Sequence, residues 1–293
     1  MKSPTSFGIW GNTEKKSFWT ILPKILSWSK KKNINAHVTS RIISHLNGTD
    51  LQVGVINSKE ILQKLDFMLV LGGDGTFLSL ARAIEYSNTP ILGIHLGDLG
   101  FLAKVTLEDL FIRLDQVSKG DFFLENRILI KSNIKKEGKI IKHTALNDFV
   151  ISNAQSHRML NATVFVNQHL VGSYKADGVI IATPTGSTAY SLSAGGPIVT
   201  PEVDSIIITP TAAHTLTSRP LVVSGKDEIR VEFLNNTDPV LFTADGQIHE
   251  TLETNNKVII TKADYKIKLI SFTDSDYFQN LRAKMGWGKR GEQ

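Results

Sequence analysis

A glycine-rich turn between an apolar run and a helical pattern constrains the fold of this chain more than any other feature. The turn reads Gly72-Gly73-Asp74-Gly75-Thr76 and follows residues 67–71, whose continuous apolar run is typical of a buried strand. Apolar side chains then recur at helical spacing through residues 77–84. Glycines at such a junction let backbone N–H groups approach an anion, and the helix start adds partial positive charge. The turn therefore predicts a phosphate site at the edge of an α/β sheet.

Asp74 is the unusual member of this turn, because a carboxylate repels phosphate. It is predicted to serve as a base for a substrate hydroxyl or as an indirect partner of a metal ion. The alternative is a structural turn in which Asp74 caps the helix. The pattern is neither a Walker A loop, since no Lys-Ser/Thr pair follows, nor the three-glycine dinucleotide fingerprint.

Composition narrows the classes of function. A chain of 293 residues can form two domains, and the absence of cysteine excludes disulfides, thiolate catalysis, zinc-thiolate sites and iron–sulfur ligation. The first residues lack the apolar core of a signal peptide and no apolar run approaches a membrane span, so we expect a cytoplasmic protein. The net charge of +5 suits an anionic ligand. Dispersed basic residues without interleaved aromatic side chains disfavour nucleic acid.

Residues 1–120 are predicted to form an α/β domain. Strands are expected at residues 7–10, 67–71 and 90–94, with a helix over 14–32 interrupted by Pro23. Further helices are expected from Thr76 and from Thr106, where Asp109 completes a pattern resembling a capping box. Strand–helix–strand order predicts a parallel sheet with helices on both faces, which binds ligands at the carboxyl ends of its strands.

Residues 121–274 are predicted to form an all-β domain of two packed sheets. A hairpin turn is expected at residues 136–139. One strand is expected from Lys139 onward, and the others cover residues 127–131, 163–166, 179–182, 206–209, 228–234, 240–243, 257–261 and 266–272. Helical spacing over residues 276–287 predicts a final helix that returns to the first domain, so that residues 275–293 complete it.

The β domain has a dense polar segment of its own at residues 172–197. Four hydroxyls and no large side chain lie within residues 183–188, so backbone can approach a ligand there. A helix is expected to start at Thr188 with a free N-terminus, which would suit an anion. The alternative is a tight turn with capping hydroxyls.

Among the shorter features, the Asn147–Asp148 pair and Phe101 each allow two interpretations. Asn147 and Asp148 could recognise a ribose diol, because a carboxylate accepts from two hydroxyls and an amide donates to one; alternatively they bond their own backbone. Asp245-Gly246-Gln247 is typical of a type I′ turn. Phe77 is expected in the core, whereas Phe101, after the glycines of residues 97–100, fits either a core or a ligand-facing position.

Together these segments resemble the NAD kinase family, the ATP:NAD 2′-phosphotransferases, and in particular its bacterial members. The matching segments follow the family's order and span nearly the whole chain: residues 72–76, 96–102, 147–148, 177–197 and 245–247. The resemblance implies an α/β domain and a β domain with the active site between them. It also implies a homotetramer or homodimer whose dinucleotide pocket lies near a subunit interface, and a divalent cation, expected to be magnesium, held mainly by nucleotide phosphates.

The resemblance also assigns roles by position. Asp74 would accept the proton of the adenosine 2′-hydroxyl, and Phe101 would lie against the dinucleotide. The remaining residues would bind nucleotide: Gly72, Gly73, Gly75 and Thr76 the phosphates, Asn147 and Asp148 hydroxyl or amide groups of NAD, Lys175 and Asp177 the nicotinamide end, Thr188, Ala189, Tyr190, Ser191, Leu192 and Ser193 the adenine pocket, and Arg158, Ala212 and Gln247 further contacts.

Departures from the family pattern occur at a few of these positions. Asp148 stands where many members have Glu, which shortens its reach by one methylene. His95 stands where Asn is frequent, so the resemblance does not carry over the hydrogen bond that Asn makes near this loop in the family. The residues around Arg158 match the family poorly.

The sequence therefore predicts an enzyme that transfers the γ-phosphoryl group of ATP to the 2′-hydroxyl of NAD. Two alternatives remain. A lipid or sphingoid-base kinase would share the glycine turn but would lack the segment at residues 183–197. A non-catalytic dinucleotide sensor would keep the pocket but would not need a carboxylate beside phosphates.

Overall fold

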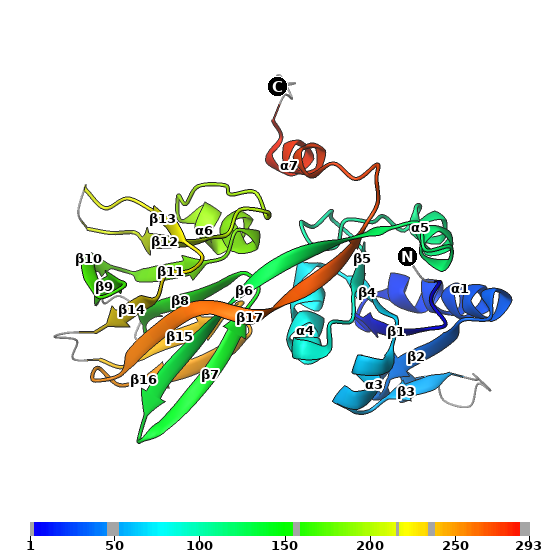
Figure 1. Ribbon diagram of the computed structural model, residues 1–293, viewed down its shortest axis with the longest axis horizontal. Coiled ribbons are helices and arrows are strands. Elements are labelled where there is room, and N and C mark those ends of the chain that lie inside the picture. The colour runs from blue at the N-terminus through cyan, green and yellow to red at the C-terminus, as the bar shows by residue number, and fades with distance from the viewer. Residues whose placement is uncertain (1–2, 46–52, 155–158, 215–216, 234–237, 288–293) are drawn as a thin grey trace. The chain divides into compact units, whose positions relative to one another are not determined.

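The computed structural model describes residues 3–45, 53–154, 159–214, 217–233 and 238–287 (Figure 1). The chain divides into two compact units, each described by itself below. Unit 1 comprises Met1–Asn126 and Ile267–Gln293, and unit 2 comprises Arg127–Lys266. Strands β6 and β17 are long, and each carries residues of both units.

Unit 1 contains the predicted parallel sheet. Its strands pair in parallel in the spatial order β5-β4-β1-β2-β3, and the end of β17 pairs beside β5 through Leu269 and Ile91. Every residue of β4 is buried, as expected for a central strand covered on both faces. The strands are β1 (Ser6–Gly11), β2 (Asn35–Thr39), β3 (Gly54–Ile56), β4 (Phe67–Gly72), β5 (Ile91–His95) and β17 (Lys257–Ser271).

Helices cover this sheet, as the coiled ribbons around β1, β4 and β5 show in Figure 1. The apolar faces of α1 and α5 pack on residues such as Phe7, Leu69 and Ile94. On the other face, Trp10 of β1 donates a 3.0 Å hydrogen bond to Ser79 of α4. The helices are α1 (Lys16–Lys32), α2 (Ser40–Ile43), α3 (Lys59–Lys64), α4 (Asp74–Ile84), η1 (Glu85–Ser87), α5 (Leu110–Ser118) and α7 (Tyr277–Met285).

Several predicted helix boundaries were wrong. α1 runs through Pro23 without interruption, because burial of its apolar face offsets the roughly 3 kcal/mol that an interior proline costs. α4 begins at Asp74 rather than Thr76. α5 begins at Leu110, because Thr106 and Asp109 instead form a turn in which their side chains bond each other at 2.9 Å.

The final helix of the described chain, α7, belongs to unit 1, as the fold prediction expected. Asp276 caps it by accepting a 2.8 Å hydrogen bond from the N–H of Phe278, and Leu281 is buried. The Nζ of Lys284 lies 5.8 Å from the ring centre of Phe101. Sequence reasoning missed β2, β3, α2 and α3, which are short and carry few apolar residues.

Unit 2 is built from two antiparallel sheets, as predicted. One runs β10-β9-β14-β17, with β6 beside β17 and β7 beside β6; the other runs β13-β12-β11-β8-β15-β16. Their inward residues form one core around Phe149, Phe233 and Phe242. The strands are β6 (Phe123–Lys136), β7 (Lys139–Ala145), β8 (Asp148–Asn153), β9 (Leu160–Val166), β10 (His169–Ala176), β11 (Gly178–Ala182), β12 (Ser205–Thr211), β13 (Leu221–Ser224), β14 (Ile229–Glu232), β15 (Val240–Ala244) and β16 (Ile248–Leu252).

The strand expected at residues 257–261 and the one expected at 266–272 are a single strand, β17. Nothing between them breaks the ladder: residues 262–265 contain neither glycine nor proline, and Ala263 is buried. The predicted β6–β7 turn is confirmed, with Lys136 opposite Lys139 and positive φ angles of 51° at Glu137 and 76° at Gly138.

Candidate functional site

The glycine-rich turn lies where β4 ends and α4 begins, at the carboxyl edge of the unit 1 sheet. A side chain at Gly72 would collide with Thr76, so the turn needs a glycine there. At Gly73 a Cβ would meet no atom within 4 Å. Open space therefore lies beside the residue that precedes an 11-residue helix, where the helix dipole favours negative charge.

The Asp74 carboxylate binds the loop that follows β5. Its Oδ2 accepts a hydrogen bond from the N–H of Phe101 at 2.9 Å, and its Oδ1 accepts from Leu102 and Ala103, both at 3.1 Å. A carboxylate offers about four acceptor positions, so these bonds occupy most of them. A Cβ at Gly100 would collide with the same Oδ1. Asp74 thus has a structural task, which is to hold this loop. It does not cap the helix, as the alternative from the sequence proposed, because Gly73 is the N-cap.

The same loop is held at its start by polar contacts that sequence reasoning did not use. Lys15 Nζ, just before α1, donates to the carbonyl of Leu96 at 3.0 Å, and the N–H of Leu96 donates to Gly72 at 3.1 Å. His95 Nδ1 lies 2.7 Å from the carbonyl oxygen of Gly97 and donates to it. The other ring nitrogen of His95, Nε2, is buried without a partner among the described residues.

In unit 2 a second carboxylate, that of Asp245, binds three successive N–H groups. Its Oδ1 accepts from Asn147 at 2.8 Å and from Asp148 at 3.1 Å, and its Oδ2 accepts from Leu146 at 3.0 Å. Asp245 and Gly246 have φ angles of 50° and 64°, and the N–H of Gln247 donates to Ala244 at 3.0 Å. The predicted type I′ turn is confirmed.

Asp148 is a buried acid of the site in unit 2. It is only 4% exposed, at the first position of β8. Burial and, secondly, the negative charge of Asp245 together raise the pKa of its carboxyl to about 7. Near neutral pH this carboxyl is therefore divided between its neutral and ionised forms.

The segment after β11 folds back onto Asn147. The Thr183 hydroxyl donates to Leu146 at 2.5 Å, and the Thr183 N–H donates to Asn147 at 2.8 Å. A Cβ at Gly186 would collide with the Asn147 carbonyl. The polar segment and the Asn147–Asp148 pair, separate in the sequence, therefore form one site.

The prediction of a helix that starts at Thr188 was wrong. The structure has a 3₁₀ turn, η2 (Thr185–Thr188), followed by a single α turn, α6 (Tyr190–Ser193). Hydroxyls of this segment bond carbonyls within it, so they stabilise a tight turn rather than a longer helix; that of Ser187 lies 2.6 Å from the Pro184 oxygen. Tyr190 is 48% exposed, whereas Ser191 is buried and lies 2.9 Å from the Thr209 hydroxyl.

The other predicted site residues of unit 2 lie at strand ends. The N–H of His214, two residues after Ala212, donates to the Lys175 carbonyl at 2.9 Å, and the N–H of Asp177 donates to the Thr211 carbonyl at 3.0 Å. Ala212 has a φ of 47°, a conformation rarely adopted by residues other than glycine. Arg158 lies outside the described residues.

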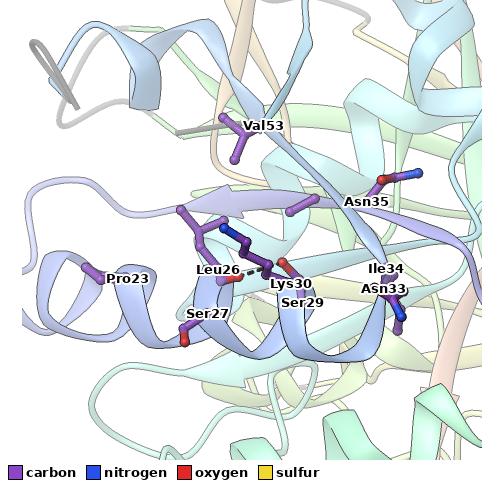
Figure 2. Close-up of a pocket in the computed structure, with 10 residues that line it drawn as sticks. Pro23, Leu26, Ser27, Ser29, Lys30, Asn33, Ile34, Asn35 and Val53 are labelled. Carbon is purple, nitrogen blue, oxygen red and sulfur yellow. Dashed lines mark hydrogen bonds between the residues drawn. The ribbon is translucent and has the colours of Figure 1, made fainter. Parts of the chain in front are cut away.

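A separate cavity of about 780 Å³ lies beside the C-terminal part of α1 and the start of β2 (Figure 2). Its lining includes Leu26, Lys30 and Asn35, and none of the predicted site residues contributes to it. Within the described residues, no cluster of three or more His, Asp or Glu side chains could hold a metal ion. No helix in the described part of the chain is long and apolar enough to cross a membrane.

Comparisons with known proteins agree with this architecture. The profile of the ATP-NAD kinase N-terminal domain matches residues 8–122, and that of the ATP-NAD kinase C-terminal domain matches residues 146–272. An NAD kinase of Geobacter sp. (strain M21) is 38% identical over 92% of this chain and 94% of its own length. An NAD kinase of Thermoanaerobacter sp. (strain X514) is 39% identical over 95% of this chain and 98% of its own.

Solved structures show the same fold. Yeast NADH kinase complexed with NADH is similar with a TM-score of 0.90 and 23% identity, over 99% of this chain and 90% of that one. An NAD kinase from Archaeoglobus fulgidus in complex with ATP is similar with a TM-score of 0.74 and 24% identity, over 96% and 98% of the two chains. The extent and identity of the sequence matches show that this chain belongs to the NAD kinase family.

Proposed function

We propose that this chain phosphorylates NAD, transferring the γ-phosphoryl group of ATP to the 2′-hydroxyl of the adenosine ribose to give NADP. The observation that carries the proposal is an acid, Asp74, at the first position of α4, directly after Gly73, where a Cβ would meet no atom within 4 Å. The family to which the chain belongs supports the same reaction.

Phosphoryl transfer depends chiefly on positioning and on stabilising charge at the phosphoryl oxygens. Gly72, Gly73, Gly75 and Thr76 would place backbone N–H groups and the N-terminus of α4 near the phosphates. Asp74 would accept the proton of the 2′-hydroxyl. Its Oδ2 is the oxygen suited to this task, because it accepts one N–H whereas Oδ1 accepts two.

Unit 2 would bind the dinucleotide. Asn147 and Asp148 would bond ribose hydroxyls, and Thr188, Ala189, Tyr190, Ser191, Leu192 and Ser193 would form the adenine pocket. Ser191 would act from behind the pocket wall, since it is buried and its hydroxyl lies beside that of Thr209. Lys175, Asp177 and Ala212 would contact the nicotinamide end, with Phe101, Arg158 and Gln247 as further contacts.

A divalent cation, a homo-oligomeric state and a cytoplasmic location belong to the same proposal. The described residues offer no cluster of metal ligands of their own, which suits a magnesium ion that stays on the nucleotide phosphates. When bound, such an ion would neutralise phosphate charge. The absence of cysteine suits a reducing compartment.

One observation keeps the dinucleotide sensor as a second candidate. Asp74 holds the loop at residues 101–103, so its presence is explained even without catalysis. A dinucleotide sensor would therefore also need this carboxylate, to hold the loop.

The deciding experiment couples the reaction to NADP-dependent glucose-6-phosphate dehydrogenase. Purified full-length chain is incubated with NAD, ATP and magnesium, and NADP is measured by the absorbance of NADPH. Steady formation of NADP is expected. Tight NAD binding without turnover would support the sensor and contradict the proposal. Separate runs with NADH as acceptor and other nucleoside triphosphates or polyphosphate as donors would define the substrate range.

A further inference from the structure

The hairpin turn between β15 and β16 carries an acid to which the proposed function assigns no role. Asp245 points its carboxylate at the backbone of residues 146–148 and accepts from all three N–H groups, at 2.8 to 3.1 Å. The backbone N–H of Asp245 in turn donates a hydrogen bond to the Asp148 carbonyl at 2.9 Å. The proposed ribose-binding pair is therefore fixed to this turn from both sides.

The same geometry places two acids in one poorly solvated region. Asp148 is 4% exposed, and its backbone N–H bonds Oδ1 of Asp245. Two neighbouring carboxylates, one of them buried, resist being ionised together. Burial is the larger cause of the rise in the pKa of Asp148, and the charge of Asp245 is the second.

Other charged groups around Asp148 are few. The strands on either side of β8, which are β11 and β15, contain no charged residue, and neither does η2. The cross-strand partner of Asp148 is Ala182. On β16, His249 and Glu250 pair with Thr243 and Phe242, further along the hairpin than the turn. Among the described residues, Asp245 is thus the charge that faces Asp148.

We propose that Asp245 is a positioning residue for dinucleotide binding, and that its charge, together with the burial of Asp148, makes this binding release a proton. The turn holds Asn147 and Asp148 in position to bind a ribose diol. An ionised carboxylate accepts the hydrogen bonds that the two hydroxyls of the diol donate. Binding therefore selects the ionised form of Asp148. This inference rests on the proposed function, because it assumes that the diol binds at this pair.

The ionised fraction of Asp148 sets how strongly the apparent Kd for NAD depends on pH. When only the ionised fraction of Asp148 binds, the apparent Kd rises as that fraction falls. With a midpoint near 7, the Kd for NAD should be about tenfold weaker at pH 6 than at pH 8. About one proton should be released per NAD bound at pH 6.

The test is calorimetric titration of full-length chain with NAD between pH 5.5 and 8.5. Two buffers with different ionisation enthalpies give the number of protons released. Asp148→Asn should bind more weakly at pH 8 and lose the pH dependence. Asp245→Asn should weaken binding and also lower the midpoint by about one pH unit, but not to the ordinary range of an aspartate, because burial remains. Asp264→Asn, which removes an exposed acid from β17, should leave the midpoint unchanged.

The outcomes separate this inference from the proposed function. NADP formation by a wild-type chain whose Kd is flat with pH overturns the inference alone. An unchanged midpoint in Asp245→Asn shows that the residue is only structural and also overturns it. Proton-linked NAD binding without NADP formation overturns the proposed function and leaves the inference standing. If Asp245→Asn fails to fold, the wild-type proton release and Asp148→Asn still decide.

Discussion

Each unit uses the carboxylate of an aspartate to hold a loop, but the two carboxylates have different surroundings. In unit 1 the carboxylate of Asp74 accepts from three successive N–H groups, those of residues 101–103; in unit 2 Asp245 does the same for residues 146–148. Hydrogen bonds to charged groups contribute roughly 1.5–3 kcal/mol each. In both places an acid therefore fixes a loop that would otherwise carry unsatisfied donors.

The difference lies in what stands beside the carboxylate. Asp74 is the first residue of α4 and follows Gly73, where a Cβ would meet no atom within 4 Å; in the proposed function the acid that fixes the loop would also accept the substrate proton. Asp245 stands beside a second, buried acid, Asp148, which is the candidate ligand contact. Under the proposed function, unit 1 would combine support and chemistry in one residue, whereas unit 2 would divide support and ligand binding between two. Variants that affect one task and spare the other test this comparison.

The largest effect is expected from Asp74→Asn. General base catalysis contributes about 10²–10⁴-fold, so kcat for NADP formation should fall by that factor. An amide NH₂ cannot accept from the loop, so the free energy of unfolding should also fall, by about 1–3 kcal/mol. The coupled assay and urea unfolding measure the two losses. Full activity would show that Asp74 serves only the loop.

A matched pair of glycine variants tests the supports themselves. In Gly100→Ala the new Cβ would collide with Asp74 Oδ1, and in Gly186→Ala it would collide with the Asn147 carbonyl. We expect each to lower the free energy of unfolding by about 1–3 kcal/mol, the cost typical of overpacking. Differential scanning calorimetry and the coupled assay give stability and kcat/KM.

Gly73→Ala is the control for this pair, since its Cβ meets no atom within 4 Å and its φ of −105° is open to any residue. It should leave the folded state intact while lowering the activity, because the methyl group enters the space proposed for phosphate. A variant as active as wild type would place the phosphates elsewhere.

Asp148→Asn should change how stability depends on pH. The pKa of Asp148 is raised to about 7 in the folded chain, against about 3.9 in an unfolded chain. Between these values the folded state holds a proton that the unfolded state has lost, so its contribution to stability falls as pH rises from about 4 to 7. The variant removes this fall. At pH 8 it should be more stable than wild type by about 1–3 kcal/mol, measured by urea unfolding.

The same measurement at pH 4 is the control for Asp148→Asn. Both side chains are then neutral in the folded chain, so the two proteins should differ little. A constant difference at all pH values would mean that Asp148 is ionised throughout and that its environment is more polar than its burial implies.

The elements predicted well are those whose signal is local. Burial of β4 follows from five consecutive apolar residues, and the β6–β7 and β15–β16 turns follow from residues that tolerate positive φ. The chain between residues 33 and 64 was missed because β3 has only three residues and α3 only six, too short for a periodic pattern.

The site was predictable in its segments but not in its contacts. Glycine turns and hydroxyl runs pointed to residues 72–76 and 183–188. The partners of Asp74 and Asp245 are backbone N–H groups. Every residue except proline carries such a group, so no side-chain pattern predicts which residues the two carboxylates bind. Gly100 and Gly186 gave the available signal: each leaves room for the polar group that approaches it.

The smallest predicted effect concerns the contact of α7 with the unit 1 loop. Lys284 Nζ lies 5.8 Å from the ring centre of Phe101, near the outer limit of a cation–π contact. Lys284→Met keeps most of the aliphatic chain and removes the charge, so the free energy of unfolding should fall by about 0.5 kcal/mol or less. The kcat should stay within about twofold, because Asp74 bonds the Phe101 N–H and not its ring. A tenfold loss of kcat in the coupled assay would mean that the ring position, as well as the backbone, supports the carboxylate, and that unit 1 also divides its tasks among several residues.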